Sequence, residues 1–182
     1  MTLGRRFDGK TVIVTGASAG VGADVAKAFA ATGARLMLVA RGKEALQEFA
    51  ASLEPVTKVA TCAMDVSDAA ACRDLIKRTQ QEFGSVHYLI NNAGAHHRGN
   101  FETVDAEQIA QMVDVNLRAP LVLTRMVLDV IAECGGGAVV NVASSAGVTP
   151  VPGSATYSAT KFGLRAFTLA LAEELRGTNV HI

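Results

Sequence analysis

The fold is decided by the stretch Thr11-Val12-Ile13-Val14-Thr15-Gly16-Ala17-Ser18-Ala19-Gly20-Val21-Gly22. Its first five residues are a β-branched run that predicts a buried strand, and a helical pattern begins at Gly20. Glycines in the turn between them allow close approach of the backbone to a ligand, and a helix N-terminus favours negative charge. A strand, glycine turn and helix in this order predict a pyrophosphate site. We assign to it Gly16, Ser18, Ala19, Gly20, Val21 and Gly22.

The rest of the chain repeats this alternation of strand and helix. Further strands are predicted at residues 35–40, 58–64, 86–91 and 138–143, with a sixth near the end of the sequence, and helices at 20–32, 43–53, 68–83, 105–133 and 157–176. Strands joined by single helices pair in parallel. We therefore expect one domain over residues 1–182: a doubly wound parallel sheet (Rossmann fold) in a three-layer α/β/α sandwich. Ligands of such sheets bind beyond the carboxyl ends of the strands, where strand order reverses.

Composition favours a small-molecule partner. The 182 residues are 49% hydrophobic, and 17 basic residues balance 17 acidic ones, so no net field attracts nucleic acid or an anionic membrane. The apolar runs are too short to span a bilayer, and the N-terminus lacks the apolar core of a signal peptide. We expect a cytoplasmic protein. The three cysteines lack metal-ligand spacing, and the adjacent His96 and His97 would point in opposite directions on an extended chain, so no metal site is predicted.

The end of the second strand indicates which cofactor is preferred. An acidic residue there would bind the ribose diol of NAD and repel the additional phosphate of NADP. Ala40 and Arg41 stand at this position instead, and a guanidinium grips phosphate through two parallel hydrogen bonds. Ser18 can add a hydroxyl contact. The sequence therefore favours NADP over NAD, although Arg41 can also be read as a solvated surface arginine.

A second group of residues indicates proton transfer. Tyr157 and Lys161 are related as i and i+4 at the start of a predicted helix, so the phenol and the ammonium lie on one face. Reduction of a carbonyl needs a hydride and a proton, and a nearby cation stabilises the phenolate form of the acid. Ser144, which we expect to end the fifth strand, can hold the substrate oxygen against the phenol. The adjacent Ser145 is expected to face elsewhere, and the apolar loop 148–153 hints at a hydrophobic substrate.

With these residues assembled, the chain resembles the short-chain dehydrogenase/reductase family over essentially its full length. The resemblance rests on Thr15–Gly22, Asn91-Asn92-Ala93-Gly94, Asn116, Ser144, and Tyr157 with Lys161. It implies that Tyr157 is the general acid/base, that Lys161 assists it and binds the nicotinamide ribose, that Ser144 orients the substrate, and that Asn116 supports a proton relay. It also implies that Asp65 and Val66 contact adenine and that Asn92, Ala93 and Gly94 border the cofactor.

The resemblance also bears on assembly and on the end of the chain. It implies a homo-oligomer, a dimer or tetramer, in which the helices at 105–133 and 157–176 pack against symmetry mates. Members of the family normally continue beyond the sixth strand, so we expect a chain shortened within or after that strand that turns over poorly. The leading hypothesis is NADP-dependent oxidoreduction of a carbonyl or secondary alcohol. The alternative is a cofactor-binding or oligomerisation module with little turnover.

Overall fold

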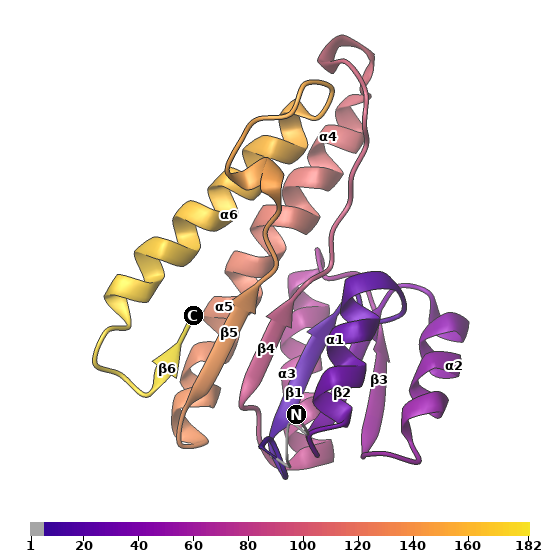
Figure 1. The fold of residues 1–182 in the computed structure, drawn as a ribbon, viewed down its shortest axis with the longest axis vertical. Helices are drawn as coiled ribbons and strands as arrows, with labels where there is room; N and C mark the ends of the chain where they lie inside the picture. The colour runs from indigo at the N-terminus through magenta and orange to yellow at the C-terminus, as the bar shows by residue number, and fades with distance from the viewer. Residues whose placement is uncertain (1–5) are drawn as a thin grey trace.

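Six short apolar runs form one parallel sheet in the computed structural model, which describes residues 6–182. The strands are β1 (Thr11–Thr15), β2 (Arg35–Ala40), β3 (Val59–Ala63), β4 (Tyr88–Asn91), β5 (Gly137–Asn141) and β6 (Val180–His181). Their order is β3-β2-β1-β4-β5-β6, and every neighbouring pair is parallel. The doubly wound sheet is therefore confirmed. Strand order reverses between β1 and β4, so the loops that follow these two strands lie side by side (Figure 1).

Helices cover both faces of the sheet because each central strand is apolar on both sides. Alternate residues of β1 serve different cores: Val12 and Val14 pack with α1 (Gly20–Ala30) and α2 (Lys43–Leu53), whereas Ile13 packs with α3 (Ala69–Phe83) and α5 (Ala119–Glu133). Both clusters consist of buried, mainly aliphatic side chains. The predicted three-layer sandwich is present, and it holds the carboxyl ends of β1 and β4 rigidly.

The helix predicted at 105–133 is not regular. It consists of α4 (Ala106–Val113), a π-helical segment (Asp114–Arg118) and α5, in one continuous run. The apolar periodicity does not reveal the wider turn. Such π segments are often found at functional sites. This one contains Asn116, whose side chain is completely buried.

Of three polar residues that precede helices, Asp68, Asp105 and Ser154, the first caps its helix. Asp68 Oδ1 accepts from the amides of Ala70 at 2.8 Å and Ala71 at 3.2 Å at the start of α3. Asp105 precedes α4, and Ser154 precedes α6 (Ala155–Glu174), but neither side chain caps its helix. A polar side chain at a helix start favours the N-cap role only while no other partner claims it. For Ser154, that competing partner is a histidine.

The loops after β4 and β5 rise together toward the starts of α4 and α6 (Figure 1).

Between residues 6 and 182, no helix combines the length and the apolar character that crossing a bilayer requires.

Candidate active site

The glycine turn after β1 leaves the start of α1 open. Gly16 (φ 65°) and Gly20 (φ 54°) have left-handed backbones, which side-chain-bearing residues rarely adopt. A Cβ on Gly22 would lie 2.2 Å from the carbonyl oxygen of Gly16, so this position must lack a side chain. The N-cap residue Ala19 makes no side-chain cap, and Ala19, Gly20 and Val21 are exposed. The first amides of α1 are therefore available to an anion.

Thr15 and Asn92 tie this turn to the loop after β4. Thr15 Oγ1 donates to the carbonyl of Ile90 at 3.1 Å and accepts from the amides of Asn92 at 3.0 Å and Ala93 at 3.1 Å. Asn92 Nδ2 donates in turn to the carbonyls of Thr15 at 3.0 Å and Gly16 at 3.2 Å. These hydrogen bonds cross the point of strand reversal. They fix the edge of the sheet where a ligand of this fold binds.

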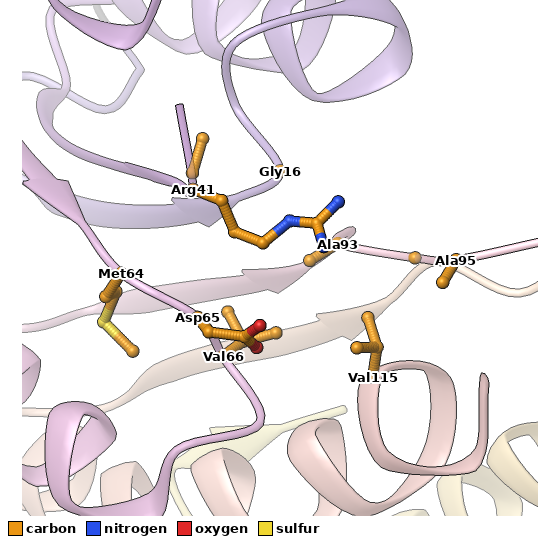
Figure 2. Close-up of a pocket in the computed structure, with 10 residues that line it drawn as sticks. Gly16, Arg41, Met64, Asp65, Val66, Ala93, Ala95 and Val115 are labelled. Atoms are coloured by element: carbon orange, nitrogen blue, oxygen red, sulfur yellow. The ribbon is translucent and has the colours of Figure 1, made fainter. Parts of the chain in front are cut away.

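A pocket opens beside this junction (Figure 2). It is lined by residues at or just after the carboxyl ends of four strands and by one residue of the π-helical segment: Gly16, Ala40, Arg41, Met64, Asp65, Val66, Ala93, Gly94, Ala95 and Val115. Most of its lining residues are apolar, and Arg41 and Asp65 are charged. An apolar pocket with a few charged groups can hold an adenine ring and its ribose.

Arg41 and Asp65 are the charged side chains of this pocket. Figure 2 shows Arg41 extended across it and the Asp65 carboxylate on the opposite side. Asp65 Oδ1 accepts from the hydroxyl of Ser67 at 2.7 Å and from its amide at 2.8 Å. These hydrogen bonds, with a smaller contribution from the Arg41 charge, lower the pKa of Asp65 below its ordinary value. No carboxylate belongs to the end of β2 itself, where Arg41 stands.

Tyr157 and Lys161 lie on one turn of α6, as their spacing predicts. The Lys161 side chain is almost fully buried, its Nζ donates to the carbonyl of Val142 at 2.8 Å, and it lies 5.8 Å from the centre of the Tyr157 ring. Burial lowers the pKa of Lys161. No carboxylate pairs with Lys161 in the described part of the chain. An ammonium has three donors, so Lys161 keeps donors for a ligand or for a phenolate.

Asn116 joins the π-helical segment to both neighbouring elements. Its Oδ1 accepts from the Ala95 amide at 2.7 Å, and its Nδ2 donates to the Ala95 carbonyl at 2.8 Å. Nδ2 also lies 3.3 Å from Thr160 Oγ1, which donates to the carbonyl of Tyr157 at 2.7 Å. A buried chain of hydrogen bonds therefore runs from the loop after β4 to the turn of α6 that carries the tyrosine.

Ser144 lies three residues beyond the end of β5 at Asn141 rather than at the end of the strand, and it precedes the short 3-10 helix Ser145–Gly147. Its Oγ accepts from the Ala146 amide at 3.2 Å, whereas Ser145 is exposed. A Cβ on Gly147 would lie 2.8 Å from the carbonyl of Lys161. The turn that holds Ser144 therefore packs directly on the Tyr157–Lys161 turn.

The structure gathers the predicted residues into two adjoining groups. Arg41, Asp65, Val66, Ala93 and Gly94 line the pocket with Gly16, while Ser18, Ala19, Gly20 and Val21 form the neighbouring helix start and Asn92 braces it. Asn116, Ser144, Tyr157 and Lys161 form the second group. Sequence reasoning missed the pocket residues Met64, Ala95 and Val115 and the linking Thr160. In the sequence, these four residues are marked only by their position next to predicted site residues.

The apolar loop 148–153 lines a groove on α6. Pro150, Val151 and Pro152 line a groove with Ala155, Ser158, Ala159 and Phe162 of α6. By helical periodicity these α6 residues lie on a different face from Tyr157 and Lys161. Within residues 6–182, no group of three metal-ligating side chains is placed to hold an ion.

Comparison with known proteins gives a consistent answer. Residues 10–182 match the family model described as short chain dehydrogenase. The ketoacyl reductase HetN of Nostoc sp. is 36% identical over 175 residues, which cover 96% of this chain and 61% of that protein. Sulfoacetaldehyde reductase 2 of Chromohalobacter salexigens is 37% identical over 173 residues, covering 94% of this chain and 69% of the relative.

Solved structures agree with this. A short chain dehydrogenase/reductase from Burkholderia phymatum, crystallised in complex with NAD, superimposes with a TM-score of 0.93 at 30% identity, covering 96% of this chain and 64% of that one. The chain spans about three fifths of the length of the first curated relatives that it matches, 61% and 58%.

Proposed function

The chain belongs to the short-chain dehydrogenase/reductase family, and on that premise we propose that it uses NADP to interconvert a carbonyl compound and a secondary alcohol, with Tyr157 as the general acid/base. Membership in this family supports an NAD(P)-dependent oxidoreductase. The choice of NADP, the role of Tyr157 and the activity of the whole protein are the proposal.

One observation carries the assignment of Tyr157. A buried ammonium without a carboxylate partner among the described residues, Lys161, stands 5.8 Å from the Tyr157 ring. Burying a cation is costly unless a negative charge or strong acceptors compensate it. A phenolate that forms and disappears during turnover is such a charge. The arrangement therefore favours a tyrosine that gives up and recovers a proton.

The bound nicotinamide would supply or accept the hydride. Tyr157 Oη donates its proton to the substrate oxygen as negative charge develops there, and it takes the proton back in the reverse direction. Ser144 Oγ donates a hydrogen bond to the same oxygen and holds it near the phenol. The spare donors of Lys161 bind ribose hydroxyls and stabilise the phenolate. Asn116 holds the backbone around Ala95 and supports the return of a proton from solvent.

Arg41 supports NADP as the cofactor. Its guanidinium extends across the pocket that suits the adenosine end of the dinucleotide (Figure 2). A phosphate on the 2′-oxygen would find a donor pair there, and it would meet no acidic residue at the end of β2. The Burkholderia phymatum relative is in complex with NAD. NAD is therefore the competing cofactor that any test must include.

The substrate is proposed only as a class. The relatives named above are reductases of a ketoacyl group and of sulfoacetaldehyde, both of which are carbonyl compounds. The full-length protein should be assayed against ketones, aldehydes and secondary alcohols, following the absorbance of reduced nicotinamide with each cofactor. We expect turnover of at least one class with preference for NADPH. Absence of turnover with both cofactors across the panel, from folded protein that binds NADPH, would contradict the proposal.

A further inference from the structure

The imidazole of His96 stacks on the ring of Tyr157. The ring centres are 4.1 Å apart and the planes are inclined by 23°, and His96 Nε2 lies 3.0 Å from Ser154 Oγ. We propose that His96 is a positioning residue, which holds the Tyr157 phenol in its reactive orientation. The inference rests on the proposed function because it assigns a role to His96 only where Tyr157 transfers a proton.

The backbone around His96 is held on both sides. The preceding residue, Ala95, has its amide and its carbonyl bonded to Asn116. Farther along the loop, the Gly99 amide donates to the carbonyl of Gly153 at 2.9 Å. The loop after β4 is therefore attached to the π-helical segment at one end and to the start of α6 at the other. A side chain mounted between these attachments has a defined direction.

Ser154 is committed to this histidine. It is the N-cap residue of α6 and is buried, yet it makes no side-chain cap. Its hydroxyl pairs with His96 instead. A serine at this position normally satisfies a free amide of its helix. The hydroxyl is thus used to orient the imidazole, and the imidazole lies flat against the phenol.

The neighbouring histidine provides an internal contrast. His97 Nε2 pairs with Gln111 Oε1 at 2.7 Å, and its amide donates to Met112 Sδ at 3.4 Å, so it faces α4. The His-His pair therefore divides between two helices, and only His96 contacts Tyr157. This contrast makes His97 a matched control of the same residue type, one position away.

Stacking restricts the two torsions that aim a tyrosine hydroxyl. A parallel offset pair favours a small range of ring orientations. Proton transfer needs the phenol oxygen within hydrogen-bond reach of the substrate oxygen, and a displacement of about 1 Å can cost about 100-fold in rate. His96 is itself exposed, so its side chain contributes little to the core and can be replaced without unfolding the chain.

The stack is tested first by nuclear magnetic resonance, without any turnover. The sequence has four histidines and no tryptophan, so the imidazole signals are few. Ring currents of Tyr157 should move the carbon-bound ring protons of His96 upfield, and Tyr157→Leu should abolish this displacement while those of His97 stay in place. His96 signals that are the same in the wild type and in Tyr157→Leu would overturn the inference.

The function of the stack is tested by kinetics on the full-length protein. We expect His96→Ala to lower kcat about 10- to 100-fold with little change in the KM for NADPH, and His96→Phe, which retains a flat ring, to restore most of kcat. A wild-type kcat in His96→Ala, or a His96→Phe variant as slow as His96→Ala, would overturn the proposal. If Tyr157→Phe retained full activity, the proposed function would fail instead, so the two failures are distinguishable.

Discussion

Asn116 and Ala95 form a closed pair in which both side-chain polar atoms of the asparagine bond both backbone polar atoms of the alanine, at 2.7 and 2.8 Å. Only one orientation of the amide satisfies this pairing, with Oδ1 facing the amide of Ala95 and Nδ2 facing its carbonyl. The pair couples the π-helical segment to the loop that carries His96. It thereby links the pocket beside the glycine turn, of which Ala95 is a lining residue, to the tyrosine.

Replacing Asn116 by aspartate should destabilise the fold. A carboxylate has no donor for the Ala95 carbonyl, and it would place negative charge at a fully buried position. We expect a loss of about 2 kcal/mol or more in the free energy of unfolding, measured by urea denaturation. Asn100→Asp, at an exposed position of the same loop, is the control. Equal urea midpoints for the two variants would show that the Asn116–Ala95 pair does not contribute this stability.

Adding a methyl group to Gly22 should disturb the glycine turn after β1. The new Cβ would meet the Gly16 carbonyl oxygen at 2.2 Å, so the turn or the helix must shift. Gly22→Ala is expected to lose about 1–3 kcal/mol of stability and to weaken NADPH binding. Thermal unfolding and cofactor titration measure the two effects. Gly42→Ala, whose Cβ meets nothing within 4 Å, should cost clearly less stability, and equal losses in the two variants would refute the steric account.

Arg41→Asp should shift cofactor preference toward NAD. The substitution removes a charged donor pair from the pocket and supplies an acceptor for a ribose diol. Since hydrogen bonds to charged groups contribute about 1.5–3 kcal/mol, the ratio of Kd values for NADPH and NADH should change at least about tenfold. Arg73→Asp makes the same charge change at an exposed site on α3. An unchanged ratio in Arg41→Asp would remove the case for NADP.

His87 should make stability depend on pH. Its Nδ1 accepts from the Thr11 amide at 3.1 Å, and burial, together with Lys10 and Arg35, lowers its pKa below the ordinary 6.5. As pH falls below 6.5, the unfolded chain takes up the proton first, so the free energy of unfolding decreases until the folded-state pKa is reached. Urea denaturation at pH 7.5 and pH 5 should show a larger decrease for the wild type than for His87→Asn. An equal decrease in the wild type and in His87→Asn would show that His87 does not contribute to the pH dependence of stability.

Local patterns were sufficient to predict most of the fold. The bounds of β1, β2 and α2 agree with the predicted 11–15, 35–40 and 43–53. β1 and β2 are continuous apolar runs, as is typical of buried parallel strands, and α2 carries its apolar residues at helical spacing. The positions of the site residues could be predicted in the same way. Arg41 directly follows β2, and Tyr157 and Lys161 lie in the first turns of α6.

The features that escaped prediction depend on contacts between distant segments. The π-helical turn at Asn116 is stabilised by a bond to Ala95 and has no periodic signature. Ser154 has the residue type of a helix cap, but its actual partner is His96, which is remote in sequence. Local propensity describes what a residue can do when no competing partner is present. The partner becomes known only when the sheet brings the two loops together.

The most direct test of the proposed chemistry is Tyr157→Phe in the full-length protein, with kcat and the Kd for NADPH measured on the same preparation. Removing the phenol oxygen keeps the ring against His96 and removes only the proton donor. We predict that kcat falls by about 10²–10⁴-fold while NADPH binding is retained. A variant that turns over carbonyl substrate at the wild-type rate would contradict the assignment of Tyr157 as the acid/base.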